Sequence, residues 1–240
     1  MERVNFYVDG FNFYHGLRRT KRTDPDWQKI YWLNFVKFFD HFMQKNEHLQ
    51  KIFYFTAPDH DPDRLLRQRI LFQANELING STFETVNGMF YRKMITCKIC
   101  NNRYRVHEEK RTDVNIAIKM LDDCFFDNAD TLVLVSADSD LISPLQLINY
   151  RFPNKKTRVY FPPGNKSDAL HNYMKTLNQQ PVYLKNNKQR FLSAVMPDTV
   201  TKDGISYTIP QKWKTYIPQP LPITTTATCP FCNSPIPSIP

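Results

Sequence analysis

The chain has 240 residues, of which 41% are hydrophobic, and it carries a formal net charge of +9. That hydrophobic content supports a folded core and excludes a wholly disordered chain. No run approaches the ~18 consecutive apolar residues of a membrane-spanning helix, and no basic and apolar leader opens the sequence. We therefore expect a cytoplasmic protein of one good-sized domain with appendages, or of two small domains, whose positive charge favours a polyanionic partner.

Strand-like and helical segments alternate along the first 180 residues. Short apolar runs predict strands at 4–8, 51–56, 131–135, 157–161 and 182–184, with a strand or hairpin arm around Asn87-Gly88. Apolar residues at helical spacing predict helices at 30–43, 61–79, 144–150 and 167–177, and from Thr112 onward. A basic turn is expected at 16–22. This alternation predicts an α/β fold, a parallel sheet flanked by helices.

Aspartates follow two of the predicted strands directly. Asp9 ends the first strand, and Asp138 and Asp140 follow the buried strand 131–135. Because ligands of open α/β sheets bind beyond the carboxyl ends of the strands, we expect these side chains at one edge of the sheet. Asp113, in the first turn of a predicted helix, adds a further acid. Crowded carboxylates repel one another, so such a cluster indicates a divalent cation.

Each of these motifs alone has an ordinary explanation. Asp-Gly is common in turns, acids at strand ends often cap helices, and the first turn of a helix favours acids. All three motifs occur together, each at the edge where a site is expected, and that combination favours a functional site. Hard oxygen ligands suit Mg²⁺ or Mn²⁺, which lower the pKa of a bound water and stabilise charge on a phosphodiester.

Basic residues flank the acidic motifs. Arg18, Arg19 and Arg22 follow the first strand, and Arg103 and Arg105 precede the helix that carries the next acid. A run of charges is usually a solvated face, but aromatic residues are interleaved with these two clusters, namely Phe11, Phe13, Tyr14 and Tyr104. Cationic side chains on phosphates and aromatic rings against bases suit a single-stranded nucleic acid, so we expect these arginines to bind one.

Four of the five cysteines form two C-x-x-C pairs, Cys97 with Cys100 and Cys229 with Cys232. In a reducing compartment this pattern favours structural zinc over a disulfide framework. The two pairs are far apart in sequence, so a shared site requires the C-terminal segment to fold back. Separate half-sites completed by His107 or by a second chain, and cysteines without a metal, stay open.

The amino-acid composition of the chain changes beyond residue 184. Proline becomes frequent, and a threonine-rich run precedes the second cysteine pair. Such composition predicts an extended arm. We therefore divide the chain into a domain at 1–180 and a C-terminal arm at 181–240 that packs back on the first cysteine pair.

Three motifs together carry a family resemblance: Val8-Asp-Gly-Phe-Asn12, Glu109-Lys-Arg-Thr-Asp-Val114 and Val135-Ser-Ala-Asp-Ser-Asp140. Over about residues 3–177 the chain resembles the NYN domain. More narrowly it is similar to the LabA-like branch, within the PIN-like nuclease superfamily. The resemblance implies a Rossmann-like α/β fold and a metal-dependent ribonuclease.

Motif matching also implies roles for particular residues. Asn12 and Ser136 would line the acidic site and position substrate or water, while Asp168 or Asn172 is a candidate for a further acidic position of the family. The acids implied to bind Mg²⁺ or Mn²⁺ and to catalyse are Asp9, Asp113, Asp138 and Asp140. We expect an endoribonuclease acting mainly on single-stranded RNA. A nucleic-acid-binding module without turnover, a DNA-directed PIN-like nuclease, and a homodimer stay open.

Overall fold

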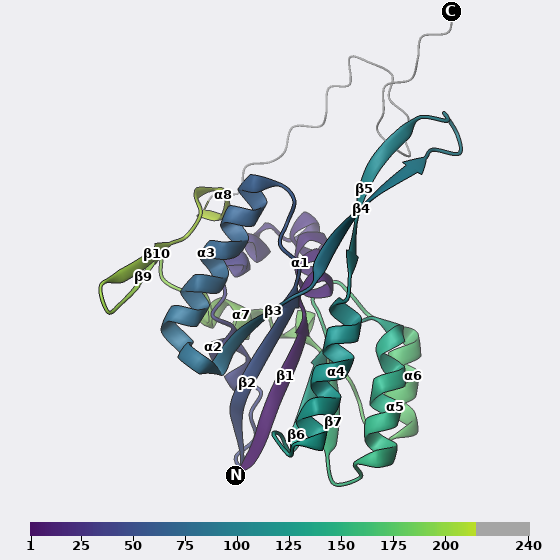
Figure 1. Ribbon diagram of the computed structural model, residues 1–240. Coiled ribbons are helices and arrows are strands. Elements are labelled where there is room, and N and C mark those ends of the chain that lie inside the picture. The colour runs from purple at the N-terminus through teal and green to yellow at the C-terminus, as the bar shows by residue number, and fades with distance from the viewer. Residues whose placement is uncertain (215–240) are drawn as a thin grey trace, which may run out of the picture.

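A parallel sheet forms the centre of the molecule. The computed structural model describes residues 1–214, except for the side chains of residues 90–92 and 106–109. The six strands are β1 (Glu2–Asp9), β2 (Glu47–Thr56), β3 (Phe83–Asn87), β6 (Thr131–Val135), β7 (Lys156–Phe161) and β8 (Val182–Tyr183). They lie in the order β3-β2-β1-β6-β7-β8, and every neighbouring pair is parallel (Figure 1). The predicted α/β fold is thereby confirmed.

Helices cover both faces of this sheet (Figure 1). One face carries α1 (Gly10–Thr23), η1 (Pro25–Trp32), α2 (Phe35–Asp40), α3 (Pro62–Asn79) and α7 (Lys188–Ser193). The other face carries α4 (Thr112–Phe125), α5 (Ile142–Arg151) and α6 (Asp168–Thr176). None of the described helices is both long and apolar enough to cross a membrane.

Strand β1 lies between the two layers of the core. Val4, Phe6 and Val8 pack against the helices of the first face, and Tyr7 packs against those of the second. All four side chains are 0% exposed. Burying each large apolar side chain is worth about 1.5–3 kcal/mol, so the near-continuous apolar run of β1 fixes its place at the centre of the sheet.

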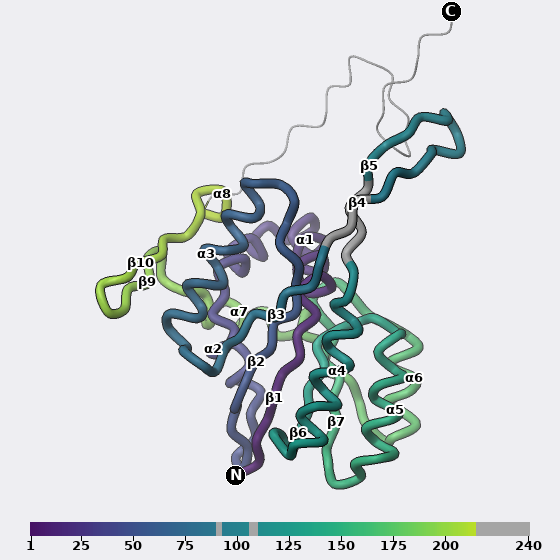
Figure 2. The backbone as a smooth tube through the Cα atoms, in the orientation of Figure 1, coloured from purple at the N-terminus to yellow at the C-terminus, as the bar shows by residue number. Residues whose placement is uncertain are grey.

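The helices that follow β1 and β6 leave the sheet on opposite faces. Figure 2 shows the backbone running from β1 directly into α1 on the first face. After β6, η3 (Ser139–Leu141) leads into α5 on the second face. Because β1 and β6 are adjacent, this is a topological switch point, the place where open α/β sheets form a ligand-binding crevice beyond the carboxyl ends of the strands.

An antiparallel hairpin projects from the same edge of the sheet. Strand β4 (Met89–Thr96) pairs with β5 (Arg103–Lys110) and with no strand of the central sheet (Figure 1). The strand or arm predicted around Asn87-Gly88 is therefore two elements, because β3 ends in the sheet at Asn87 and β4 begins in the hairpin at Met89. The hairpin leads directly into α4.

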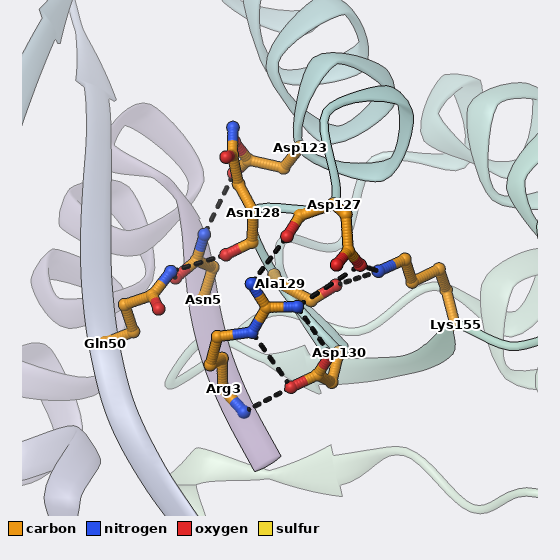
Figure 3. A network of polar contacts seen from close by, with 9 residues as sticks. All are labelled: Arg3, Asn5, Gln50, Asp123, Asp127, Asn128, Ala129, Asp130 and Lys155. Atoms are coloured by element: carbon orange, nitrogen blue, oxygen red, sulfur yellow. Dashed lines mark hydrogen bonds and ion pairs between the residues drawn. The ribbon is translucent and has the colours of Figure 1, made fainter.

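Acidic residues away from the crevice are tied into ion pairs and hydrogen bonds that hold the sheet together (Figure 3). The Arg3 guanidinium donates to both carboxylate oxygens of Asp130, from Nε at 3.1 Å and from Nη2 at 2.8 Å. Lys155 donates to Asp127 and to the Ala129 carbonyl oxygen. These contacts bind the segment between α4 and β6 to β1 and to the start of β7.

Residues 182–214 differ from the extended arm expected over 181–240. They form β8, η4 (Leu184–Asn187), α7, a hairpin of β9 (Thr199–Lys202) and β10 (Ile205–Thr208), and α8 (Gln211–Lys214). Leu184 and Phe191 are fully buried, and the Phe191 ring stacks on Phe38 with centroids 3.9 Å apart. These buried apolar side chains hold the segment in a folded conformation, although its proline content predicted an extended one. Residues 215–240 lie outside the described part of the chain.

Two local expectations also need correction. The basic segment 16–22 is not a turn but the second half of α1. The helix predicted over 30–43 is interrupted, because η1 ends at Trp32 and the Asn34 side chain caps α2 by accepting from the Lys37 backbone N–H at 3.0 Å.

Candidate active site

Asp9 occupies the last position of β1 and the N-cap of α1, at the switch point. Its Oδ1 accepts from the Asn12 backbone N–H at 2.9 Å, and its Oδ2 accepts from Asn12 Nδ2 at 2.7 Å and from Ser136 Oγ at 2.7 Å. The side chain is buried. Asn12 and Ser136 therefore fix the orientation of this carboxylate, as their predicted positions beside it suggest.

Ser136 links Asp9 to the acids that follow β6. Its Oγ accepts from the Asp138 backbone N–H at 3.0 Å while it donates to Asp9. Asp138 in turn caps η3, because its Oδ1 accepts from the Asp140 backbone N–H at 2.9 Å. Asp9 and Asp138 thus have the ordinary capping role and still lie at one edge of the sheet.

Asp113 reaches the same place from the first turn of α4. Burial, and then the negative charges of Asp9, Asp138 and Asp140, raise the pKa of its carboxyl group to about 6. The pKa of Asp9 is also raised, chiefly by burial, against the lowering effect of its hydrogen bonds. Four carboxylates from three separate segments therefore act on one another electrostatically, and we call them the acidic cluster.

The donor set of the acidic cluster suits a hard divalent cation. In the described part of the chain, no three acidic, His or Cys side chains stand close enough together to enclose an ion. Mg²⁺ does not require such a cage, because it keeps several waters and is usually held by one or two carboxylates together with substrate phosphates. The carboxylates also have no cationic partner within ion-pair distance among the described residues, so their repulsion is uncompensated.

Asn165 supports the site from the loop after β7, and the sequence did not single it out. Its Nδ2 donates to the Asn12 carbonyl oxygen at 2.7 Å and to Asn12 Oδ1 at 3.1 Å, and its Oδ1 accepts from Arg19. The loop lies so close to α1 that a Cβ on Gly16 would be 2.1 Å from the Pro163 carbonyl oxygen. The position of Asn165 beyond a strand end was the available signal.

A groove lined by three arginines runs along the exposed side of α1, next to Asn12. We call it the arginine groove; its volume is about 370 Å³ and it is lined by Phe11, Asn12, His15, Arg18, Arg19, Arg22 and Asn165. Helical spacing brings the predicted Arg18, Arg19 and Arg22 together. Within residues 1–214 as described, no carboxylate lies within ion-pair distance of Arg18 or Arg22. Both charges are available to an anion.

The aromatic residues beside this groove divide into exposed and core members. Phe11 is 44% exposed and its ring lies 4.3 Å from that of His15, whereas Phe13 is 1% exposed and belongs to the core. Burial and the nearby charges of Arg18, Arg19 and Arg64 lower the pKa of His15. In the arginine groove, Phe11 therefore offers a ring that can contact a base, and His15 is neutral near pH 7.

The predicted basic residues Arg103 and Arg105 lie elsewhere, on strand β5 of the projecting hairpin. Both are exposed. At about 3.4 Å per residue, the backbone of Arg105 is roughly 17 Å before the end of β5. The structure thus places them along the hairpin and not beside the acidic cluster.

Cys97 and Cys100 belong to the turn that joins the two strands of the hairpin. The Cys97 N–H donates to the Asn102 carbonyl oxygen, and the Asn101 N–H donates to the Cys97 carbonyl oxygen, both at 2.9 Å. Asn101 has a φ of 54°, the left-handed conformation that asparagine tolerates. The predicted zinc partners of this pair, Cys229 and Cys232, lie outside the described residues.

The candidates for a further acid lie at the start of α6. Asp168 is exposed and pairs with Lys166 at 3.1 Å, and Asn172 is also exposed. Neither is among the residues that raise the pKa of Asp113. The acidic cluster therefore consists of the four aspartates already described.

Comparisons with known proteins identify the family of the chain. The family described as "NYN domain" matches residues 3–177. No curated protein matches the chain. A crystal structure of a Vibrio parahaemolyticus protein of unknown function is 22% identical, covers 72% of this chain and 88% of its own, and has a TM-score of 0.46. From the family match, which confirms the resemblance, the chain belongs to the NYN domain family, within the PIN-like nuclease superfamily.

Proposed function

We propose that this protein is a Mg²⁺- or Mn²⁺-dependent endoribonuclease that acts mainly on single-stranded RNA. The observation that carries the proposal is the acidic cluster at the switch point, beside a groove with arginines that have no carboxylate partner among the described residues. NYN domains are generally nucleases, and metal-dependent hydrolysis of a phosphodiester can use both features. The acids would hold a cation, and the arginines would hold phosphates.

The residues of the cluster have distinct tasks in this reaction. Asp9, oriented by Asn12 and Ser136, would be a fixed cation ligand, and Asp138 would be the second. A bound divalent cation supplies a water of lowered pKa and stabilises charge on the phosphate. Asp113 has a pKa of about 6 without a cation, so it loses its remaining bound proton when a cation binds beside it.

The arginine groove favours a flexible strand as substrate. Arg18, Arg19 and Arg22 can contact successive phosphates, and Phe11 offers an exposed ring against which a base can stack. Stacking requires an unpaired base, which a single strand provides and a duplex does not. The preference for RNA over DNA rests on the resemblance to ribonucleases of this family.

Incubation of the purified protein with circular single-stranded RNA tests the proposal directly, since only an endonuclease can open a circle. Matched single-stranded DNA and double-stranded RNA serve as comparisons, each with Mn²⁺, Mg²⁺ or EDTA. We expect cleavage of circular RNA with either cation and none in EDTA. Cleavage that continues in EDTA would refute metal dependence, and RNA binding without cleavage under any condition would favour a binding module.

We further propose a structural Zn²⁺ site that joins Cys97 and Cys100 to Cys229 and Cys232. The tight turn around the first pair supports this proposal, because it places two thiols at the end of a hairpin. Such a site would fix the C-terminal segment to the hairpin, beside the strand that leads to Asp113. The narrower LabA-like placement and the state of oligomerisation stay predictions.

A further inference from the structure

A second hollow lies between α1 and α3, at the carboxyl end of β2. We call it the aromatic pocket; its volume is about 270 Å³. Its lining includes large rings from different parts of the chain, among them Tyr14, Tyr31, Phe72 and Trp213. Pockets for drug-sized ligands have volumes of ~300–1,000 Å³, so this one suits a smaller ligand with one flat ring system.

The rings at the open side are set against one another. Trp213, on α8, stacks on Tyr31 with ring centroids 5.8 Å apart and planes 27° apart. Tyr14 contacts the same tyrosine at a centroid distance of 5.8 Å. Trp213 is only partly buried, unlike Trp27 and Trp32 in the core. Flat walls of this kind bind planar heterocycles by stacking.

Cationic side chains from two helices stand around the same pocket. Arg18 comes from α1, and Arg64 and Arg67 come from the first turns of α3. Arg67 is half-buried and has no carboxylate within ion-pair distance in the part of the chain that the structure describes. Gln68 fixes the adjacent wall, because its Nε2 donates to Thr56 Oγ1 and to the Ala57 carbonyl oxygen, both at 3.0 Å. Arg64 lies 4.0 Å from Asp59, which also lines the pocket, so Arg18 and Arg67 are the lining arginines without a carboxylate partner among the described residues. A flat anionic ligand fits this lining.

The aromatic pocket and the arginine groove are neighbours that share part of their walls. Phe11, His15 and Arg18 line both of them. The groove also includes Asn12, whose amide donates to Asp9 in the acidic cluster. A single strand can therefore place a phosphate in the groove and turn a neighbouring base into the pocket.

We propose that the aromatic pocket binds one unstacked nucleobase of the substrate strand, next to the phosphodiester that is hydrolysed at the acidic cluster. The identity of this ligand rests on the proposed nuclease function, whereas the pocket itself does not need a cation. Flat walls, arginines from two helices and the wall shared with the arginine groove together favour a nucleotide over an apolar ligand. Recognition of a base here would give the enzyme a sequence preference at one position.

Binding of nucleoside 5′-monophosphates in EDTA tests the pocket without catalysis. We expect AMP, GMP, CMP or UMP to quench the fluorescence of Trp213, the partly exposed tryptophan of the described chain, and we expect Trp213→Phe to lose most of that signal. Tyr14→Ala and Arg67→Gln should each weaken binding, by about tenfold or more for the lost ring. Tyr150→Ala removes a 76% exposed ring on α5 and is the control.

Cleavage of RNAs with a single abasic site completes the test. An abasic site at one position near the cut should raise the KM of the wild-type enzyme, and Arg67→Gln should no longer distinguish abasic from intact RNA at that position. If no nucleotide binds and every abasic RNA is cut with an unchanged KM, the pocket proposal is overturned while the nuclease function stands. If nucleotides bind but no RNA is cut, the pocket is supported and the nuclease function fails. Melting temperatures show that each variant is folded.

Discussion

Aspartates have two different environments in this molecule. Asp123, Asp127 and Asp130 contact cations or other donors that neutralise or solvate their charge. In the acidic cluster, Asp9 accepts only from uncharged groups, and burial and its neighbours raise the pKa of Asp113 to about 6. The first group therefore stabilises the fold, whereas the second lowers stability unless a cation is bound.

Asp123 provides the residue-scale test of this division. Its carboxylate is buried and accepts from Tyr7 Oη at 2.6 Å and Asn5 Nδ2 at 3.0 Å, and it pairs with Lys119 at 2.8 Å. Asp123→Asn removes the charge that pairs with Lys119, so we expect a loss of about 1–3 kcal/mol in the free energy of unfolding, measured by urea titration. Unchanged stability would contradict the structural role.

The raised pKa of Asp113 predicts that the stability of the metal-free protein depends on pH. Its pKa is about 6 when folded, above that of an unfolded aspartate. Its stabilising contribution is thus complete below about pH 4 and is lost as the pH rises through about 6. In EDTA, Asp113→Asn should raise the melting temperature at pH 7.5 and not at pH 4. Because the Asp113 carboxylate is only partly shielded from solvent, the gain is limited to about 1 kcal/mol. An equal rise in melting temperature at both pH values would argue against repulsion among the carboxylates of the acidic cluster.

Helix α1 is the element that connects the acidic cluster to the substrate. It begins at the Asp9 cap and carries Arg18 and Arg22 along its exposed side. For a single strand, the slope of log affinity against log salt concentration is about −0.7 per phosphate contact. The double variant Arg18→Gln, Arg22→Gln should therefore reduce the slope by about 1.4 in RNA-binding titrations. The control is the double variant Arg151→Gln, Lys175→Gln on α5 and α6, which should leave the slope unchanged. An equal effect of both double variants would refute the arginine groove as the RNA-binding surface.

The turn of the β4–β5 hairpin carries the first cysteine pair of the proposed zinc site. We expect about one zinc per chain in protein purified under reducing conditions, and its loss in Cys97→Ser, as measured by elemental analysis. Cys124 is buried on α4 with a pKa raised to about 11, chiefly by burial, so Cys124→Ser is the control that retains zinc. Zinc-free wild-type protein would exclude the site.

Elements whose apolar pattern is local could be predicted from the sequence, and those fixed by distant contacts could not. The strands β1 and β6 are continuous apolar runs, so their place in the sheet follows from burial on both faces. The helical extent of α1 was missed because Gly16 suggested a turn, whereas in the fold it permits the close approach of the Pro163 loop. The burial of Phe191 could likewise not be predicted, since it depends on contact with Phe38, which is distant in the sequence.

At the scale of the whole molecule, the same distinction applies to the site. Three of the acids could be predicted to share an edge because strand ends meet there, and in the structure Asp9, Asp138 and Asp140 act electrostatically on Asp113. The role of Asn165 and the aromatic pocket could not be predicted from the sequence. Both depend on tertiary packing against α1, which involves α3, α8 and the loop that follows β7. Sequence motifs therefore identify the chemistry, while the substrate-contacting surfaces follow only from the tertiary arrangement.

The measurement that tests the central claim most directly is made on Asp138→Asn, with RNA cleavage, RNA affinity and melting temperature determined on the same protein. Loss of outer-shell partners of a metal typically costs 10–100-fold in activity, so loss of a ligand charge should lower cleavage by more than about 100-fold. Affinity for RNA and the melting temperature should be retained, since the arginine groove and the core are untouched. Full cleavage activity in Asp138→Asn would contradict the assignment of the acidic cluster as the catalytic site.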